Sequence, residues 1–404
     1  MGVKASPLTR GIERQGMVNF SSTGNNGPQG LFQINPAVRR SAAMVVIWLV
    51  IVNGFALVAF NRLNLAPDTA FRWIARAGIT PPAQSWEIVD IHSRWDSYWY
   101  LDIVKEGYYL RGEKGIANVV FFPLYPFLIR AAAPLAGGDP VLAGWMVSSV
   151  FLVLAAAVLV RLTQRFHPEI DPLMPVLFLL AYPTAFILNA VYSESLFLFL
   201  SLAAVYYARE EKFLIASLFV AFASATRIAG LFLCVLLLVE FVQSRGWKSL
   251  FSWRVWPLVP APAGAFGFFL YHWAAFGDFF LYLKIQNNWG RDFEFAAADY
   301  MVSNSPYWIN MVTDLLFMAL VIVIGLLALK QLRISYGLYM LVSMGIALST
   351  GTFLAITRYS MMLFPIYLMV ASMGSVLGRG SWMLISVLLL AMNIIAFLNH
   401  YWVG

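Results

Sequence analysis

The side chains best suited to chemistry gather in residues 90–109, whose sequence is DIHSRWDSYWYLDIVKEGYY. Asp90, His92, Arg94 and Asp96 come just before an aromatic run. Ionisable groups this close to apolar segments cost free energy to place, so they tend to mark a functional site. The alternative is structural, because Asp96 or Ser97 could cap the N-terminus of a helix formed by that run. The two roles are compatible, since a capping aspartate is held rigidly.

Three ionisable residues further along the chain stand at the ends of apolar runs. Glu194 in VYSESLF begins one such run, where it could simply complement the helix dipole. Arg227 in ATRIAG and Arg358 in AITRY have no acidic neighbour in sequence. Each of them could extend to the membrane surface. Two arginines presented from different helices would also suit a phosphate, which a guanidinium binds through two hydrogen bonds.

Other chemical motifs are missing from the sequence. It contains neither a Walker A loop nor G-x-G-x-x-G, so nothing predicts a nucleotide site. Its 4 histidines have no helical metal-ligand spacing, and we predict neither a metal nor a cofactor. The loop QNNWGRDFEF (286–295) is acidic and aromatic, and it could touch a sugar or serve as a plain connection.

The composition shows which solvent the helices meet. Of 404 residues, 61% are hydrophobic and 12% are charged, and mean hydropathy is +0.74. Soluble domains are about half apolar and about a quarter charged, so this chain is an integral membrane protein. The net charge of +7 does not predict nucleic-acid binding, because the basic residues mostly flank apolar segments. The single cysteine, Cys234, excludes a disulfide framework.

The apolar segments predict an all-α polytopic protein with about 11 transmembrane helices. The predicted spans are 42–60, 141–160, 173–191, 195–208, 213–227, 228–243, 256–276, 309–329, 335–356, 359–377 and 382–402. With the N-terminus inside and the C-terminus outside, the short outer connections hold only Arg227, Lys284, Arg291 and Arg358, whereas the inner ones hold more basic residues, as the positive-inside rule requires. The inner basic residues are Arg161, Arg165, Arg209, Lys212, Arg245, Lys248, Arg254, Lys330, Arg333 and Arg379. The eight Lys and Arg of the long segment 61–140 do not count against this, since long loops cross the membrane largely regardless of charge. Residues 1–40 are then a cytoplasmic, disordered tail, and 41–404 form the membrane domain.

The first extracytoplasmic loop, residues 61–140, is predicted to carry interfacial helices. Residues 68–78 and 97–107 each place apolar side chains at helical spacing and end in glycine. Both segments are predicted to form amphipathic helices that lie on the membrane surface. FFPLYPFLI (121–129) is too short to span, and its two prolines predict a broken segment that docks on the outer leaflet or re-enters it. In this topology the polar residues share the outer face, which predicts one outward-facing cavity.

Four motifs in order give the sequence a specific resemblance. RWDSYWYLDIVKEGY (94–108), FFPLYPFL (121–128), NAVYSESLF (189–197) and TRIAG (226–230) resemble the PIG-V family, which comprises GPI mannosyltransferase 2 and its bacterial homologues. The resemblance implies a GT-C glycosyltransferase fold and a polyprenyl-phosphate-linked sugar donor, since the eukaryotic relatives use dolichyl-phosphate-mannose. For a chain with such short loops it implies a multi-pass protein of the cell (inner) membrane whose active site faces the periplasm.

The resemblance also gives roles to the residues. Inverting transfer needs one carboxylate base that takes a proton from the acceptor hydroxyl, and Asp96 is the first candidate with Asp90 second. The donor phosphate would meet Arg227, Arg358 and Arg94, which would stabilise its growing charge. The expected substrate pocket comprises His92, Trp95, Tyr98, Trp99, Tyr192 and Glu194. The acceptor would be a lipid, a glycan or a protein, with membrane lipids around the chain.

A lipid-linked sugar flippase or a small-molecule transporter is the alternative function. Intramembrane ionisable residues and a helix broken near Pro183 would fit a transporter too. Transporters usually contain paired internal repeats, which this sequence lacks. They also need polar residues at the middle of the membrane, whereas these residues cluster at one face.

Overall fold

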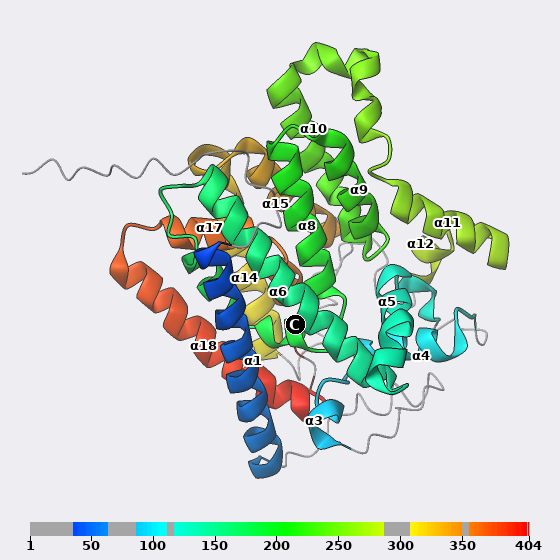
Figure 1. Ribbon diagram of the computed structural model, residues 1–404, viewed down its shortest axis with the longest axis vertical. Coiled ribbons are helices and arrows are strands. Elements are labelled where there is room, and N and C mark those ends of the chain that lie inside the picture. The colour runs from blue at the N-terminus through cyan, green and yellow to red at the C-terminus, as the bar shows by residue number, and fades with distance from the viewer. Residues whose placement is uncertain are drawn as a thin grey trace, which may run out of the picture. The chain divides into compact units, whose positions relative to one another are not determined.

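The computed structural model describes residues 35–63, 86–110, 117–286, 308–349, 355–401 and 403. Every regular element in these ranges is a helix, which confirms the all-α prediction (Figure 1). The predicted tail as far as residue 34, the predicted helix over 68–78 and nearly all of the loop 286–295 lie outside the described residues.

Five helical stretches are long and apolar enough to cross a bilayer within the described part of the chain. They are α1 (Pro36–Arg62), α6 (Pro140–Phe166), the run Ile228–Arg245 that ends in α10 (Phe232–Arg245), residues Val312–Gln331 of α14 (Trp308–Gln331), and α18 (Val376–Leu398). Capping residues mark where such helices begin. At α6, Asp139 accepts hydrogen bonds from the amides of Val141 and Leu142 and precedes Pro140. Their outward side chains stay exposed, as lipid contact requires.

Shorter helices fill the space between the long ones. The central one is α8 (Glu194–Arg209), which packs against α6 and is buried along almost its whole length (Figure 1). The other elements are α9 (Phe213–Ser224), α11 (Ala263–Phe276), α12 (Leu281–Gln286), α15 (Ile334–Ser349), η4 (Ile228–Leu231), η5 (Trp247–Phe251) and η6 (Trp253–Leu258). The burial of α8 fixes the position of Glu194 in its first turn.

Several predicted spans are not continuous helices, and two of them bear on the site. Segment 173–191 divides into α7 (Met174–Leu180) and η3 (Ala185–Asn189), and segment 359–377 divides into α16 (Ile356–Met361) and α17 (Pro365–Ser372). Pro183 and Pro365 stand at the breaks, where a missing amide proton prevents the helix from continuing. The helix break predicted near Pro183 is therefore confirmed, whereas the break before Pro365 was not predicted. The total of about 11 spans stays a prediction.

The first loop is folded onto the bundle by short helices. α4 (Asp96–Glu106) confirms the helix predicted over 97–107. The segment 121–129 was predicted to be broken, but it forms most of α5 (Leu124–Ala132). Both of its prolines fall at the helix start, where the backbone amides have no intrahelical partner to lose. The remaining elements of the loop are α3 (Glu87–Asp90), η1 (Asn118–Val120) and η2 (Ala133–Ala136).

A close backbone contact joins α9 and α11. A Cβ atom at Gly264 would lie 2.0 Å from the carbonyl oxygen of Ala221, so a larger residue cannot fit there. The amide of Ala265 donates a hydrogen bond to Oγ of Ser224 at 3.2 Å, so the end of α9 caps the start of α11. This contact holds the end of α9, three residues before Arg227.

Gly264→Ala should lower the free energy of unfolding by about 1–3 kcal/mol, because the methyl group forces the two backbones apart. Gly267→Ala is the matched control on the same helix, with nothing within 4 Å of its Cβ position. It should be neutral or stabilise by up to about 1 kcal/mol through helix propensity. Thermal unfolding of both purified variants tests this, and equal effects would contradict the close contact.

Candidate active site

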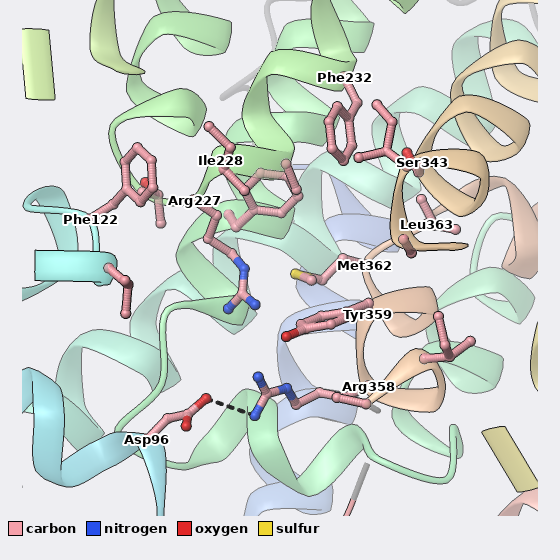
Figure 2. A pocket seen from close by; sticks show the side chains of 18 of the residues that line it. Asp96, Phe122, Arg227, Ile228, Phe232, Ser343, Arg358, Tyr359, Met362 and Leu363 are labelled. Carbon is pink, nitrogen blue, oxygen red and sulfur yellow. Dashed lines mark ion pairs between the residues drawn. The ribbon is translucent and has the colours of Figure 1, made fainter. Parts of the chain in front are cut away.

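A cavity of about 270 Å³ lies between α4, the junction of α9 and α10, α15 and α16. One part of its lining is polar and carries Asp96, Tyr100, Arg227, Arg358 and Tyr359. Figure 2 shows the Asp96 carboxylate facing Arg358, while Arg227 points into the same space. Much of the remaining wall is apolar and includes Phe122, Ile228, Phe232, Met344, Met362 and Leu363. The cavity therefore combines two guanidinium groups with a largely hydrophobic surface.

Asp96 is the first residue of α4 and points its carboxylate into the cavity. Nη1 of Arg358 lies 2.9 Å from its Oδ2 (Figure 2). The amide of Asp96 donates to the hydroxyl of Tyr192 at 3.2 Å, and that hydroxyl donates to the carbonyl of Arg94 at 3.2 Å. The N-cap residue is Trp95, without a side-chain cap bond. Capping by Asp96 or Ser97 was therefore the wrong alternative, and the carboxylate is available to the cavity.

The backbone at Trp95 takes an uncommon conformation that aims Asp96. Its φ of 53° and ψ of −115° lie outside the regions that non-glycine residues usually occupy. The indole Nε1 donates to the carbonyl of Tyr401 at 3.0 Å, which ties this turn to the end of the chain. Such a conformation persists when surrounding contacts hold it, and it is often found at functional sites.

Glu194 is the buried counter-charge for both arginines of the cavity. Its side chain is 0% exposed, and its Oε1 lies 2.8 Å from Nη1 of Arg227 and 3.5 Å from Nε of Arg358. Arg227 also donates to Oγ of Ser193 at 3.0 Å, and that oxygen lies 2.9 Å from the hydroxyl of Tyr100. Two carboxylates thus face two guanidinium groups, and each guanidinium has a fixed direction.

Tyr359 completes the surroundings of the two arginines. The guanidinium carbons of Arg227 and Arg358 lie 5.5 and 5.2 Å from the centre of its ring. An aromatic face attracts cations at this distance without neutralising them. Tyr359 therefore stabilises both arginines without adding a further counter-charge.

A buried aspartate on α14 holds the helix that carries Arg358. Asp314 is 2% exposed, and its Oδ1 accepts hydrogen bonds from the amide of Thr357 at 2.9 Å and from its hydroxyl at 2.8 Å. The N-cap residue of α16, Ala355, has no side chain that could do this. Asp314 therefore caps α16 from a neighbouring helix, one residue before Arg358.

Asp90 and Arg94 do not line the cavity. Nη2 of Arg94 lies 2.9 Å from Oδ2 of Asp90, and Nη1 donates to the carbonyls of Asp90 and Ser93 at 2.6 and 2.7 Å. Arg94 is 2% exposed, and its Nε donates to the carbonyl of Leu398 at 3.5 Å, so its donors are used within the protein and not in the cavity. In the structure these two residues shape the turn that precedes Asp96, and their roles as base and phosphate ligand stay predictions.

His92 joins the first loop to the long helices. Its Nε2 lies 2.8 Å from Oδ1 of Asn53 on α1, and its ring stacks on Trp145 of α6 at 4.1 Å. Asn189 donates to the same Asn53 oxygen at 2.8 Å. Burial lowers the pKa of His92 to about 3, which keeps the ring neutral at physiological pH. The histidine lies outside the cavity lining.

The other predicted pocket residues do not line the cavity. These are Trp95, Tyr98, Trp99, Tyr192 and Glu194. Sequence reasoning missed Tyr100, Ser193, Tyr359 and Asp314. Tyr100 stands four residues after Asp96, so helical spacing alone could have placed the two on one face. Asp314 is the lone acidic residue of the apolar run VTDLLFMALVIVIGLL, which is a signal of its own.

Asp314→Ala should cost about 1–3 kcal/mol of stability, because the amide and hydroxyl of Thr357 lose their buried acceptor. Asp314→Asn keeps a carbonyl oxygen at the same place and should retain most of that stability. Thermal unfolding of the two variants measures the difference. If both variants unfolded together at the wild-type temperature, Asp314 would not be the cap of α16.

Comparisons with known proteins bear on the family and the fold. Residues 84–254 match the family described as Mannosyltransferase (PIG-V). No characterised protein matches the chain in a sequence search. Among solved structures, ArnT from Cupriavidus metallidurans, bound to undecaprenyl phosphate, superposes with a TM-score of 0.50 and 12% identity, covering 89% of this chain and 77% of ArnT. The resemblance predicted from the motifs is therefore confirmed: over residues 84–254 the chain matches the PIG-V mannosyltransferase family, and its fold is GT-C.

Proposed function

We propose that this protein is an inverting mannosyltransferase that moves a sugar from a polyprenyl-phosphate donor to a hydroxyl group of a lipid, glycan or protein. One observation carries the proposal. The Asp96 carboxylate and the guanidinium groups of Arg227 and Arg358 meet at the polar part of a largely apolar cavity. A base and a phosphate site are the two groups that such a transfer needs.

The cavity suits a donor with a charged phosphate and a long hydrocarbon chain. Arg227 and Arg358 come from separate helices and can bind phosphate oxygens from two directions. Phe232, Met362 and Leu363 line the adjoining apolar wall, against which a prenyl chain would lie. The undecaprenyl phosphate bound to ArnT, a protein of similar fold, supports this class of donor.

The reaction is a single displacement at the anomeric carbon. The acceptor oxygen forms a bond to that carbon as the bond between the carbon and the phosphate oxygen breaks. The Asp96 carboxylate takes the hydroxyl proton, and the polyprenyl phosphate leaves with the electron pair. Arg227 and Arg358 stabilise the charge that grows on the leaving phosphate, because fixed cations in a dry site need little reorganisation.

Arg358 connects the phosphate site to the base. Its guanidinium lies 2.9 Å from Asp96, and a bound phosphate would compete for the same donors. Donor binding would then weaken the hold on Asp96 and leave its carboxylate able to accept a proton. Glu194 is fully buried behind the arginines and would continue to hold Arg227 during this exchange.

The proposed reaction takes place on the extracytoplasmic side of the membrane. The distribution of Lys and Arg among the short connections supports this orientation. A donor that is anchored in the lipid needs no soluble nucleotide, which agrees with the lack of a nucleotide-binding motif in the sequence.

Asp96→Asn should lower the turnover of a polyprenyl-phosphate mannose by about 10²–10⁴-fold, since the amide cannot accept the proton. Binding of undecaprenyl phosphate should persist, because both arginines remain. Glu106→Gln is the matched control, as its side chain is 44% exposed on the same helix and outside the cavity. Wild-type turnover in Asp96→Asn would eliminate this base, while an equal loss in Glu106→Gln would point to a disturbed helix.

A cysteine at position 105 tests the side of the membrane. The side chain of Lys105 is 79% exposed at the end of α4, so Lys105→Cys in a Cys234→Ser background should react with an impermeant maleimide added outside cells. Lys248→Cys, which is exposed on η5, should react only after the membrane is opened. The reverse pattern would place the proposed active site in the cytoplasm.

A further inference from the structure

A second cavity, of about 300 Å³, lies where α9 begins and α10 ends. Its charged lining residues are Lys212, Arg245, Arg254 and one carboxylate, Glu211. The rest of the lining is apolar and includes Leu214 and Phe241. The cavity thus carries an excess of positive charge beside a hydrophobic wall.

This basic cavity is distinct from the active-site cavity. α9 runs from Phe213 at the basic cavity towards Arg227 at the active site, and α10 runs back from Phe232 to Arg245. The two helices have 12 and 14 residues. At about 1.5 Å per residue, the two cavities lie about 20 Å apart along the helix axes. A ligand of the basic cavity would therefore lie at the opposite end of these helices from the donor.

The segment after α10 shows the depth of the basic cavity in the membrane. η5 and η6 are too short to span and expose Trp247, Phe251 and Trp253, with exposed fractions of 62%, 82% and 78%. Tryptophan is enriched at the level of lipid headgroups, and short basic-aromatic segments lie along that surface. Because Arg254 belongs to η6 itself, the basic cavity lies at the same level as the lipid phosphates.

The two arginines of this cavity can accept an anion. Among the residues that the structure describes, no carboxylate forms an ion pair with Arg245 or Arg254. Arg245 instead places its guanidinium carbon 5.6 Å from the centre of the Phe213 ring. Lys212 is 3.9 Å from Glu210, whose other oxygen is engaged with Arg165 at 2.9 Å. Guanidinium groups bind phosphate oxygens well, so the charge matches a phosphate better than a neutral headgroup.

We propose that the basic cavity binds the phosphate headgroup of an anionic membrane phospholipid. Arg245 and Arg254 contact the phosphate, Lys212 adds charge, and an acyl chain lies against the apolar lining near Phe241. The site does not depend on the glycosyltransferase reaction, and it lies in the opposite leaflet from the donor site.

Native mass spectrometry of the intact protein with added phosphatidylglycerol tests the site, with phosphatidylcholine as the neutral lipid. Arg254→Gln should reduce phosphatidylglycerol binding about fivefold, since one basic residue at an anionic surface contributes about 1 kcal/mol. Arg245→Gln should do the same, and Arg254→Lys should retain part of the binding. Lys248→Gln removes the same charge from the neighbouring η5, outside the cavity, and should leave binding of the single lipid unchanged.

Three results would contradict the proposed phospholipid site. An equal loss of phosphatidylglycerol binding in Lys248→Gln would mean that the lipid is attracted to the whole basic segment and not to this cavity. Equal binding of phosphatidylcholine would show no selection for negative charge. Thermal stabilisation by inorganic phosphate alone to the same extent as by phosphatidylglycerol would mean a free anion site. The variants should unfold at the wild-type temperature in phosphatidylcholine nanodiscs, and a variant that does not is replaced by its lysine counterpart.

Discussion

The candidate site depends on one buried charge, the Glu194 carboxylate between two arginines. Arg227 and Arg358 lie in an apolar helix bundle, where an unpaired cation would be costly. Removing one partner from a buried ion pair typically costs about 3–5 kcal/mol, because the remaining charge stays desolvated. With Glu194 in place, the two guanidinium groups can stand close together at one cavity and still turn donors towards it. A phosphate site in a membrane protein needs this combination of charge and fixed direction.

The rest of the bundle brings three separate pieces to Glu194. The buried α8 presents the carboxylate at its first turn, and the junction between α9 and α10 presents Arg227. The short helix α16 presents Arg358 and is capped by Asp314 from α14. Irregular backbone within a membrane is tolerated where protein surrounds it or where it lines a cavity. The breaks within segments 173–191 and 359–377 fit this rule, since η3 is buried and α16 lines the cavity.

The sequence predicted the fold class and three residues of the cavity. Hydropathy identified the helical membrane domain, and ordered motifs identified the family over residues 84–254. Asp96, Arg227 and Arg358 were singled out as ionisable groups beside apolar runs, and the structure brings all three to one cavity. These three residues could be recognised because ionisable side chains are costly in apolar segments and therefore rare there, so each one stands out in the sequence.

The remaining residues could not be placed because sequence proximity does not define a facing direction. Arg94 lies two residues from Asp96, yet it turns back to Asp90 because a tight turn separates the two positions. Likewise, His92 is directed towards Asn53 on α1. Prolines in the motif of α5 suggested a break, but their position in the first helical turn makes them harmless. Asp314 belongs to a distant helix, and only the folded chain shows that it holds Arg358.

The most direct test of the central claim is a structure of the purified protein with undecaprenyl phosphate, determined by cryo-electron microscopy. The account predicts the phosphate within hydrogen-bond distance of both Arg227 and Arg358. It also predicts that the prenyl chain lies along Phe232 and Met362, and that Arg358 has moved from Asp96 towards the phosphate. A phosphate bound elsewhere, with Arg358 still paired to Asp96, would contradict the account.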